Sequence, residues 1–235
     1  MTGSDQVWGP VMNGTYDDSY CLSFTDKNKV AYASSFGHID ITKELEDYYK
    51  KWLSKYKFIA VREDSAVDIL KGINIEAKQV LDPTLLLDKS YWEKLSKPIK
   101  KQKYVLVYQL HNNKELDDYA KRVAEMKGLP LIRISPFFHQ VSRPGKFIWC
   151  PKLAKFLSYV MNAECMITDS FHGTAFAINF NTPFVEVLPN NNTGTRNLSI
   201  LNLTKLTDRV LRDANNVDLA NEEIDFSYAN SVIEE

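Results

Sequence analysis

Short apolar runs alternate with amphipathic segments along the first part of this chain. The runs have the length of strands, and the segments between them repeat apolar residues at helical spacing. Strands are expected at 29–33, 58–61 and 79–81, and helices at 42–56 and 65–70. Strand–helix–strand order with short connections predicts a parallel sheet with helices packed on it.

The same pattern starts again after a polar stretch at 88–103, which carries six lysines. Strands are expected at 104–108, 131–134, 165–167 and 184–187, and helices at 113–127, 151–160, 171–180 and 198–206, with a loop at 190–194. The repeated pattern predicts an α/β fold with two Rossmann-like domains and parallel sheets, divided into residues 1–95 and 96–235. In such folds, ligands bind beyond the carboxyl ends of the strands.

The composition narrows the class of protein. A length of 235 residues with 44% hydrophobic residues suffices for two modest cores, and a net charge of −1 disfavours nucleic-acid binding. No apolar run reaches the ~18 residues of a membrane span, and the first residues lack the features of a signal peptide. We therefore expect a cytoplasmic protein.

The three cysteines form no C-x-x-C pair, which favours buried reduced thiols over a zinc site or disulfides.

The segment 167–176 carries the strongest chemical signal. An apolar strand ends in the polar turn 168–170, and a helix of small residues starts directly afterwards. The free N–H groups of a helix N-terminus attract anions, and Gly173 allows a close backbone approach. His172 lies in the first turn, where it is either a functional group or a structural histidine.

Four other charged residues are candidates for the same site. Asp5 lies in a turn of small residues, where it either handles a hydroxyl proton or caps a turn. Arg62 follows a strand and either grips an anion or pairs with Glu63 or another acid. Arg196 and Lys146 lie in irregular stretches from which they could reach the site, or they are solvated surface residues.

Several common active-site motifs are absent from the sequence. It contains no G-x-G-x-x-G, no G-x-x-x-x-G-K-[ST], no H-E-x-x-H and no G-x-S-x-G. The sequence therefore disfavours a dinucleotide-binding Rossmann enzyme, a P-loop protein, a zincin metalloprotease and a serine hydrolase.

Taken together, five segments resemble the polysaccharide pyruvyl transferase family: Gly3-Ser4-Asp5-Gln6-Val7-Trp8, Ala33-Ser34-Ser35-Phe36-Gly37, Val61-Arg62-Glu63-Asp64-Ser65, Val80-Leu81-Asp82-Pro83-Thr84 and Thr168-Asp169-Ser170-Phe171-His172-Gly173-Thr174-Ala175. The resemblance implies a fold like that of the GT-B glycosyltransferases. It also implies transfer of a pyruvyl group from phosphoenolpyruvate to two hydroxyls of a glycan or lipid-linked sugar, forming a ketal without a metal or another cofactor.

The resemblance also implies roles for individual residues. His172 would be the catalytic acid and Asp5 would orient or deprotonate the acceptor. Arg62 and the helix start, with Ser170, Gly173 and Thr174, would hold the anionic donor. Because Ser170 stands where the family is expected to have an arginine, Arg196 or Lys146 would supply the missing positive charge.

A second departure from the family concerns the first domain, which is expected to lack its N-terminal strands. The expected consequences are an exposed sheet edge, self-association into a homo-oligomer and reduced activity of this chain alone. A transient contact with a membrane surface is considered for the lysine-rich stretch 88–103. Two alternatives stay open: a GT-B-like glycosyltransferase that uses a nucleotide sugar, and a non-catalytic glycan-binding subunit.

Overall fold

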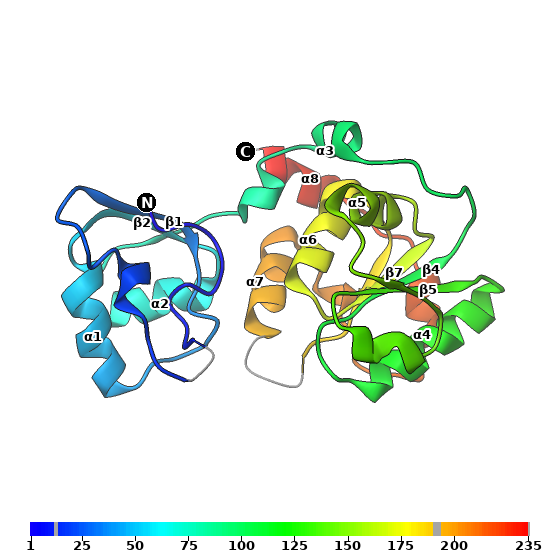
Figure 1. Cartoon of the computed structure of the whole chain (residues 1–235), viewed down its shortest axis with the longest axis horizontal. Coiled ribbons are helices and arrows are strands. Elements are labelled where there is room, and N and C mark those ends of the chain that lie inside the picture. Colours follow the sequence, from blue (N-terminus) through cyan, green and yellow to red (C-terminus); the bar gives the residue numbers. More distant parts are fainter. Residues whose placement is uncertain (12–13, 190–193, 235) are drawn as a thin grey trace. The chain divides into compact units, whose positions relative to one another are not determined.

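The computed structural model describes residues 1–11, 14–189 and 194–234, so the predicted loop at 190–194 lies outside the described residues except for Gly194. Figure 1 traces the helices and strands. The chain forms two compact units: Met1–Pro83 with Asn191–Ile200, and Thr84–Asn190 with Leu201–Glu235. Each unit contains one parallel sheet, so the predicted α/β fold with two parallel sheets is confirmed.

The first unit is built on a three-stranded sheet in the order β1-β2-β3. Its elements are β1 (Lys29–Ser34), α1 (Lys43–Leu53), β2 (Tyr56–Val61), α2 (Asp64–Gly72) and β3 (Lys78–Gln79). Aromatic side chains dominate its core: the rings of Trp8 and Tyr49 both contact Phe36, with centroids 5.2 Å and 4.9 Å away. The apolar stripe of α1 supplies Tyr49, as the helical spacing predicts.

The outer edge of β1 is partly covered by the chain's first residues. Thr2 and Asp5 form parallel bridges to Ala31 and Ser34. The Thr2 amide donates to the Val30 carbonyl at 2.9 Å, and the Thr2 carbonyl accepts from Tyr32 at 3.0 Å. The expectation of an exposed sheet edge is therefore corrected along this stretch, because backbone groups of residues 2–5 satisfy those of β1.

The second unit contains a five-stranded parallel sheet in the order β6-β5-β4-β7-β8. The strands are β4 (Val105–Tyr108), β5 (Leu131–Ser135), β6 (Lys146–Trp149), β7 (Cys165–Thr168) and β8 (Phe184–Glu186). Numbered within the unit, this order reads 3-2-1-4-5, which is the order of a doubly wound Rossmann sheet. The strand order reverses between β4 and β7.

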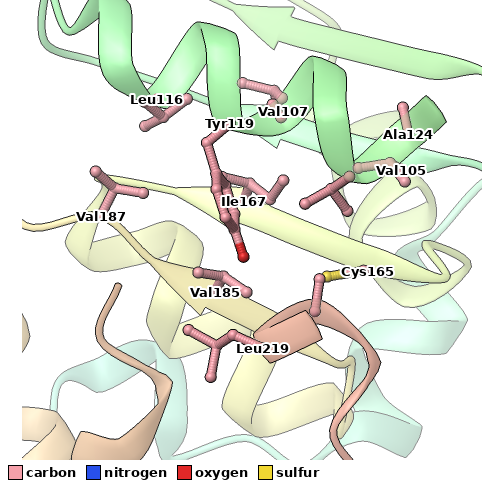
Figure 2. Close-up of a cluster of buried hydrophobic side chains, with 13 residues drawn as sticks. Val105, Val107, Leu116, Tyr119, Ala124, Cys165, Ile167, Val185, Val187 and Leu219 are labelled. Atoms are coloured by element: carbon pink, nitrogen blue, oxygen red, sulfur yellow. The ribbon is translucent and has the colours of Figure 1, made fainter. Parts of the chain in front are cut away.

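Helices pack on both faces of this sheet. The helices of this unit are α3 (Lys89–Leu95), α4 (Lys114–Lys127), α5 (Leu153–Met161), α6 (Phe171–Phe180) and α8 (Ser227–Glu234), while α7 (Gly194–Thr204) spans the division between the units. Figure 2 shows Leu116 and Tyr119 of α4 pointing onto the face that carries Val107. Because side chains alternate along a strand, Tyr108 faces the other way and contacts Phe156 of α5.

The compact units divide after Pro83, earlier than the boundary that the sequence pattern placed near residue 95. The reason is that α3 packs on the second unit: the Trp92 ring contacts Phe176, with centroids 5.4 Å apart, and its Nε1 donates to the Thr84 carbonyl at 3.2 Å. In the described part of the chain, no helix is both long and apolar enough to cross a membrane.

Candidate functional site

The first candidate cluster lies at the point where the strand order of the second unit reverses. Tyr108 at the end of β4 pairs with Thr168 at the end of β7. The segments that follow these two strands carry His111 and His172. In doubly wound sheets, ligands bind in the crevice beyond these strand ends. The fold therefore places both histidines where a ligand site is expected.

Asp169 connects the two segments. Its carboxylate accepts hydrogen bonds from the Leu110 amide at 2.7 Å and the His111 amide at 2.9 Å. The Nδ1 atom of His111 lies 3.2 Å from Asp169 Oδ2. The Asp169 side chain is buried, whereas the His111 side chain keeps 32% of its exposure. A carboxylate at Nδ1 orients a histidine and leaves Nε2 for proton transfer. Sequence reasoning missed His111, although it closely follows a predicted strand.

Ser170 and Thr174 use their polar groups within the fold. Ser170 caps α6, where its Oγ accepts from the Gly173 amide at 3.2 Å, and its own amide donates to Thr168 Oγ1 at 3.0 Å. The Thr174 hydroxyl is within hydrogen-bond range of both the Ser170 carbonyl and the buried Glu186 carboxylate. These contacts explain why α6 starts at this point.

Gly173 is required by packing. A Cβ atom at this position would lie 2.5 Å from Thr168 Oγ1 and 2.9 Å from Met166 Cε. The small residue therefore lets α6 approach β7 closely. The sequence had suggested a close approach of the backbone to a ligand.

His172 lines a cavity of 350 Å³. The other lining residues are Tyr108, Ile134, Pro136, Cys150, Pro151, Leu153, Phe156 and Phe176. Most of these side chains are apolar or aromatic. The cavity suits a ring or another weakly polar group better than a bare phosphate.

The second candidate cluster, in the first unit, surrounds Arg62. The guanidinium is buried, and its Nη1 lies 2.8 Å from Asp82 Oδ2. Its Nε lies 3.5 Å from Glu63 Oε1, and its Nη2 lies 3.7 Å from Asp5 Oδ1. The structure therefore pairs Arg62 with acids of its own unit, which is the alternative that the sequence left open.

Arg196 and Asp5 lie in the same cluster. Burial lowers the pKa of Arg196, and the neighbouring Arg62 charge lowers it further, while Glu63 and Asp5 oppose the shift. Among the described residues, the Arg196 Nε has no hydrogen-bond partner. Asp5 has a φ of 100° and keeps 66% of its side-chain exposure. Asp5, Arg62 and Arg196 therefore lie together within the first unit, whereas the sequence had suggested that Arg196 serves the site of His172.

Glu63 is a further member of this cluster that sequence reasoning treated only as a partner for Arg62. Burial raises the pKa of Glu63, although the neighbouring Arg62 charge opposes this shift. A buried carboxyl group with a raised pKa is a typical proton donor. The sequence feature that could have pointed to Glu63 is the dipeptide Arg62-Glu63 at the end of a predicted strand.

The structure does not bring Lys146 to the carboxyl ends of the strands. Lys146 is the first residue of β6 and pairs with Ile132 near the start of β5. It is therefore at the amino end of the sheet, because parallel strands share their direction. The stretch that the sequence suggested to be irregular contains this strand, so the predicted substrate-binding role of Lys146 is corrected.

The fold defines an α/β protein with a Rossmann-like unit, and its strand reversal is a candidate ligand site. The model of the family described as polysaccharide pyruvyl transferase matches residues 1–192. The chain therefore belongs to the polysaccharide pyruvyl transferase family. No protein with a curated description matches it.

Solved structures of three sugar-nucleotide epimerases are similar to this chain. UDP-N-acetylglucosamine 2-epimerase from Rickettsia bellii is 14% identical over 92% of this chain and 71% of its own, with a TM-score of 0.44. UDP-GlcNAc 2-epimerase from Neisseria meningitidis, bound to UDP-GlcNAc, is 8% identical over 97% and 75%, with a TM-score of 0.49. UDP-GlcNAc 2-epimerase from Methanocaldococcus jannaschii, in complex with UDP-GlcNAc and UDP, is 14% identical over 77% and 56%, with a TM-score of 0.43.

Proposed function

We propose that this protein transfers a pyruvyl group from phosphoenolpyruvate to two hydroxyls of a sugar, forming a cyclic ketal during the assembly of a cell-surface polysaccharide. The observation that carries the proposal is the family match over residues 1–192, which includes Asp5, Arg62 and His172. The acceptor is a glycan or a lipid-linked sugar.

The reaction defines what the residues must do. A proton adds to the methylene carbon of phosphoenolpyruvate, and the adjacent carbon gains the character of an oxocarbenium ion. One sugar hydroxyl forms a C–O bond to this carbon and loses its proton. The C–O bond to phosphate then breaks. The second hydroxyl closes the ring, and its proton goes to the departing phosphate, which is released as hydrogen phosphate.

The histidines of the second unit are the candidates for proton transfer. An unperturbed imidazole titrates near pH ~6.5, so it can give or take a proton near neutrality. His172 lines the cavity, and His111 is held by Asp169 at its Nδ1. We assign His172 to the proton delivered to the donor. His111 is the alternative donor or the base.

The first unit supplies the charged groups. Arg196 is the cation of this unit that we assign to an anionic group of a ligand, since Asp82 already holds Arg62. Arg62 then acts by positioning its neighbours. Asp5 keeps an exposed carboxylate, which suits a hydrogen bond to an acceptor hydroxyl.

One observation favours a second candidate function. The apolar and aromatic lining of the His172 cavity suits the planar base of a nucleotide sugar. Thermal-shift titrations with phosphoenolpyruvate and with a set of nucleotide sugars separate the two functions. Stabilisation by phosphoenolpyruvate supports pyruvyl transfer, whereas stabilisation by a nucleotide sugar alone supports glycosyl transfer. No shift with any of them, together with binding of the acceptor glycan, would indicate a non-catalytic binding subunit.

A further inference from the structure

The region around β6 and the start of α5 combines exposed aromatic side chains with positive charge. Phe138, Trp149 and Leu153 keep 61%, 60% and 56% of their exposure, and Phe137 keeps 43%. Soluble proteins rarely leave several large apolar side chains exposed together without a binding role. We define the aromatic–basic surface by these four residues with Lys152 and Lys155.

These side chains form a connected group. The rings of Phe138 and Trp149 meet edge to face, with centroids 5.5 Å apart. The Trp149 Nε1 donates to the Pro136 carbonyl at 3.1 Å, which fixes the indole at the surface. Leu153 and Pro136 both line the cavity that contains His172. The aromatic–basic surface is therefore continuous with the rim of the candidate site.

The charge of this region has one sign. No Asp or Glu occurs between Glu125 and Glu164 in the sequence. Within that span, Arg133 and Arg143 pair with Asp117. Lys152 and Lys155 are exposed, and neither forms an ion pair with a described residue. Their charges are thus available to an anionic partner.

The lysine-rich stretch extends this positive charge. The Lys97 amide donates to the Ala154 carbonyl at 3.0 Å and to Ser158 Oγ at 3.1 Å, so the stretch packs beside α5. Lys100 and Lys101 are exposed. Exposed aromatic rings next to lysines are typical of surfaces that lie at the headgroup level of an anionic membrane.

We propose that the aromatic–basic surface docks this protein on an anionic lipid bilayer. The rings of Phe138 and Trp149 insert at the headgroup level, and Lys152 and Lys155 contact the lipid phosphates. A second copy is disfavoured as the occupant, because β6 is a four-residue edge strand with Pro144 before it and Pro151 after it, which hinders strand pairing. The inference does not depend on pyruvyl transfer, because membrane binding needs neither donor nor acceptor.

Cosedimentation with vesicles tests this inference. The full chain is mixed with vesicles of phosphatidylcholine and phosphatidylglycerol, and separately with vesicles of phosphatidylcholine alone. We expect binding to the anionic vesicles only. Each lysine removed in Lys152→Gln/Lys155→Gln should weaken binding about fivefold, and Phe138→Ala/Trp149→Ala should abolish the blue shift of tryptophan fluorescence on binding.

Matched controls change the same residue types elsewhere. Lys71→Gln/Lys78→Gln removes two exposed lysines of the first unit, and Phe24→Ala removes a phenylalanine that is 74% exposed. Both should bind like the parent, and unchanged unfolding midpoints verify that all variants are folded. Equal binding to both kinds of vesicle, or unaffected binding of the surface variants, would overturn the proposal. The proposal would also be overturned if the parent binds no vesicles and instead forms a dimer in solution that Phe138→Ala/Trp149→Ala dissociates.

Discussion

Asp82 holds the guanidinium of Arg62 through a contact of 2.8 Å, and both side chains are 2% exposed. The same carboxylate accepts a hydrogen bond from Ser4 Oγ at 2.8 Å. The pair therefore ties the end of β2 to the segment that follows β3 and to the N-terminal turn. Asp82 supports the position of Arg62, whose guanidinium also lies near Glu63 and Asp5.

Replacing Asp82 should destabilise the first unit. Asp82→Asn keeps the shape of the side chain but leaves a buried guanidinium with a weaker partner. Removing one partner of a buried pair typically costs about 3 kcal/mol or more in the free energy of unfolding. Urea unfolding measures this loss, with the exposed Asp40→Asn as the control, for which we expect a change within about 0.5 kcal/mol. An equal change in the free energy of unfolding of both variants would show that the pair of Asp82 and Arg62 does not stabilise the fold.

Glu63 should make the free energy of unfolding fall as pH rises, whereas an acid with a lowered pKa makes it rise. Burial raises its pKa above the ordinary value of 4.5, so the folded state binds this proton more tightly than the unfolded state. Stability contributed by the protonated form is present below the ordinary pKa and is lost as pH rises through the folded pKa. We expect Glu63→Gln to remove this loss, so that its stability relative to the parent increases with pH.

Urea midpoints of the parent and Glu63→Gln, measured from mildly acidic to neutral pH, provide the check. The difference between the two proteins isolates Glu63 from the other titrating groups. A difference that stays constant across this range would contradict the assignment of a raised pKa.

Gly173 should tolerate no side chain. In Gly173→Ala, the new Cβ would meet Thr168 and Met166 at less than 3 Å, and such overpacking typically costs about 1–3 kcal/mol. Gly72→Ala is the matched control, because Gly72 is also helical and its Cβ would meet nothing within 4 Å. Thermal unfolding should show a lower midpoint for the first variant and no loss for the second. Equal unfolding midpoints would show that packing does not require glycine at position 173. They would favour the alternative, in which Gly173 lets the backbone approach a ligand.

Cys150 should react before the other two thiols. It is exposed at the cavity that contains His172, whereas Cys21 and Cys165 are buried. Burial raises the pKa of Cys21 to about 11 and that of Cys165 to about 12. We expect a thiol reagent to modify the native protein at Cys150 and all three cysteines after denaturation, as read by mass spectrometry. Rapid modification of a native Cys150→Ser variant would contradict this order.

The sequence pattern identified elements but not the partners of their side chains. The helix 171–180 and the strand at 165–167 were predicted closely, because their apolar runs are bounded by polar turns and a cap. The strand Lys146–Trp149 was missed, since Pro144 and Gly145 before it resemble a loop. Long-range pairing explains the other misses. No local pattern shows that Asp82 binds Arg62, or that Asp169 binds the loop with His111.

Pyruvyl transfer is tested most directly by incubating the protein with phosphoenolpyruvate and a soluble acceptor glycan, and measuring released phosphate together with the ketal by mass spectrometry. We predict equal amounts of phosphate and ketal, and no phosphate without acceptor. His172→Ala should lower the rate about 100-fold or more, and the exposed His139→Ala should leave it unchanged. Phosphate release without acceptor, an unaffected His172→Ala, or turnover of a nucleotide sugar in place of phosphoenolpyruvate would contradict the account.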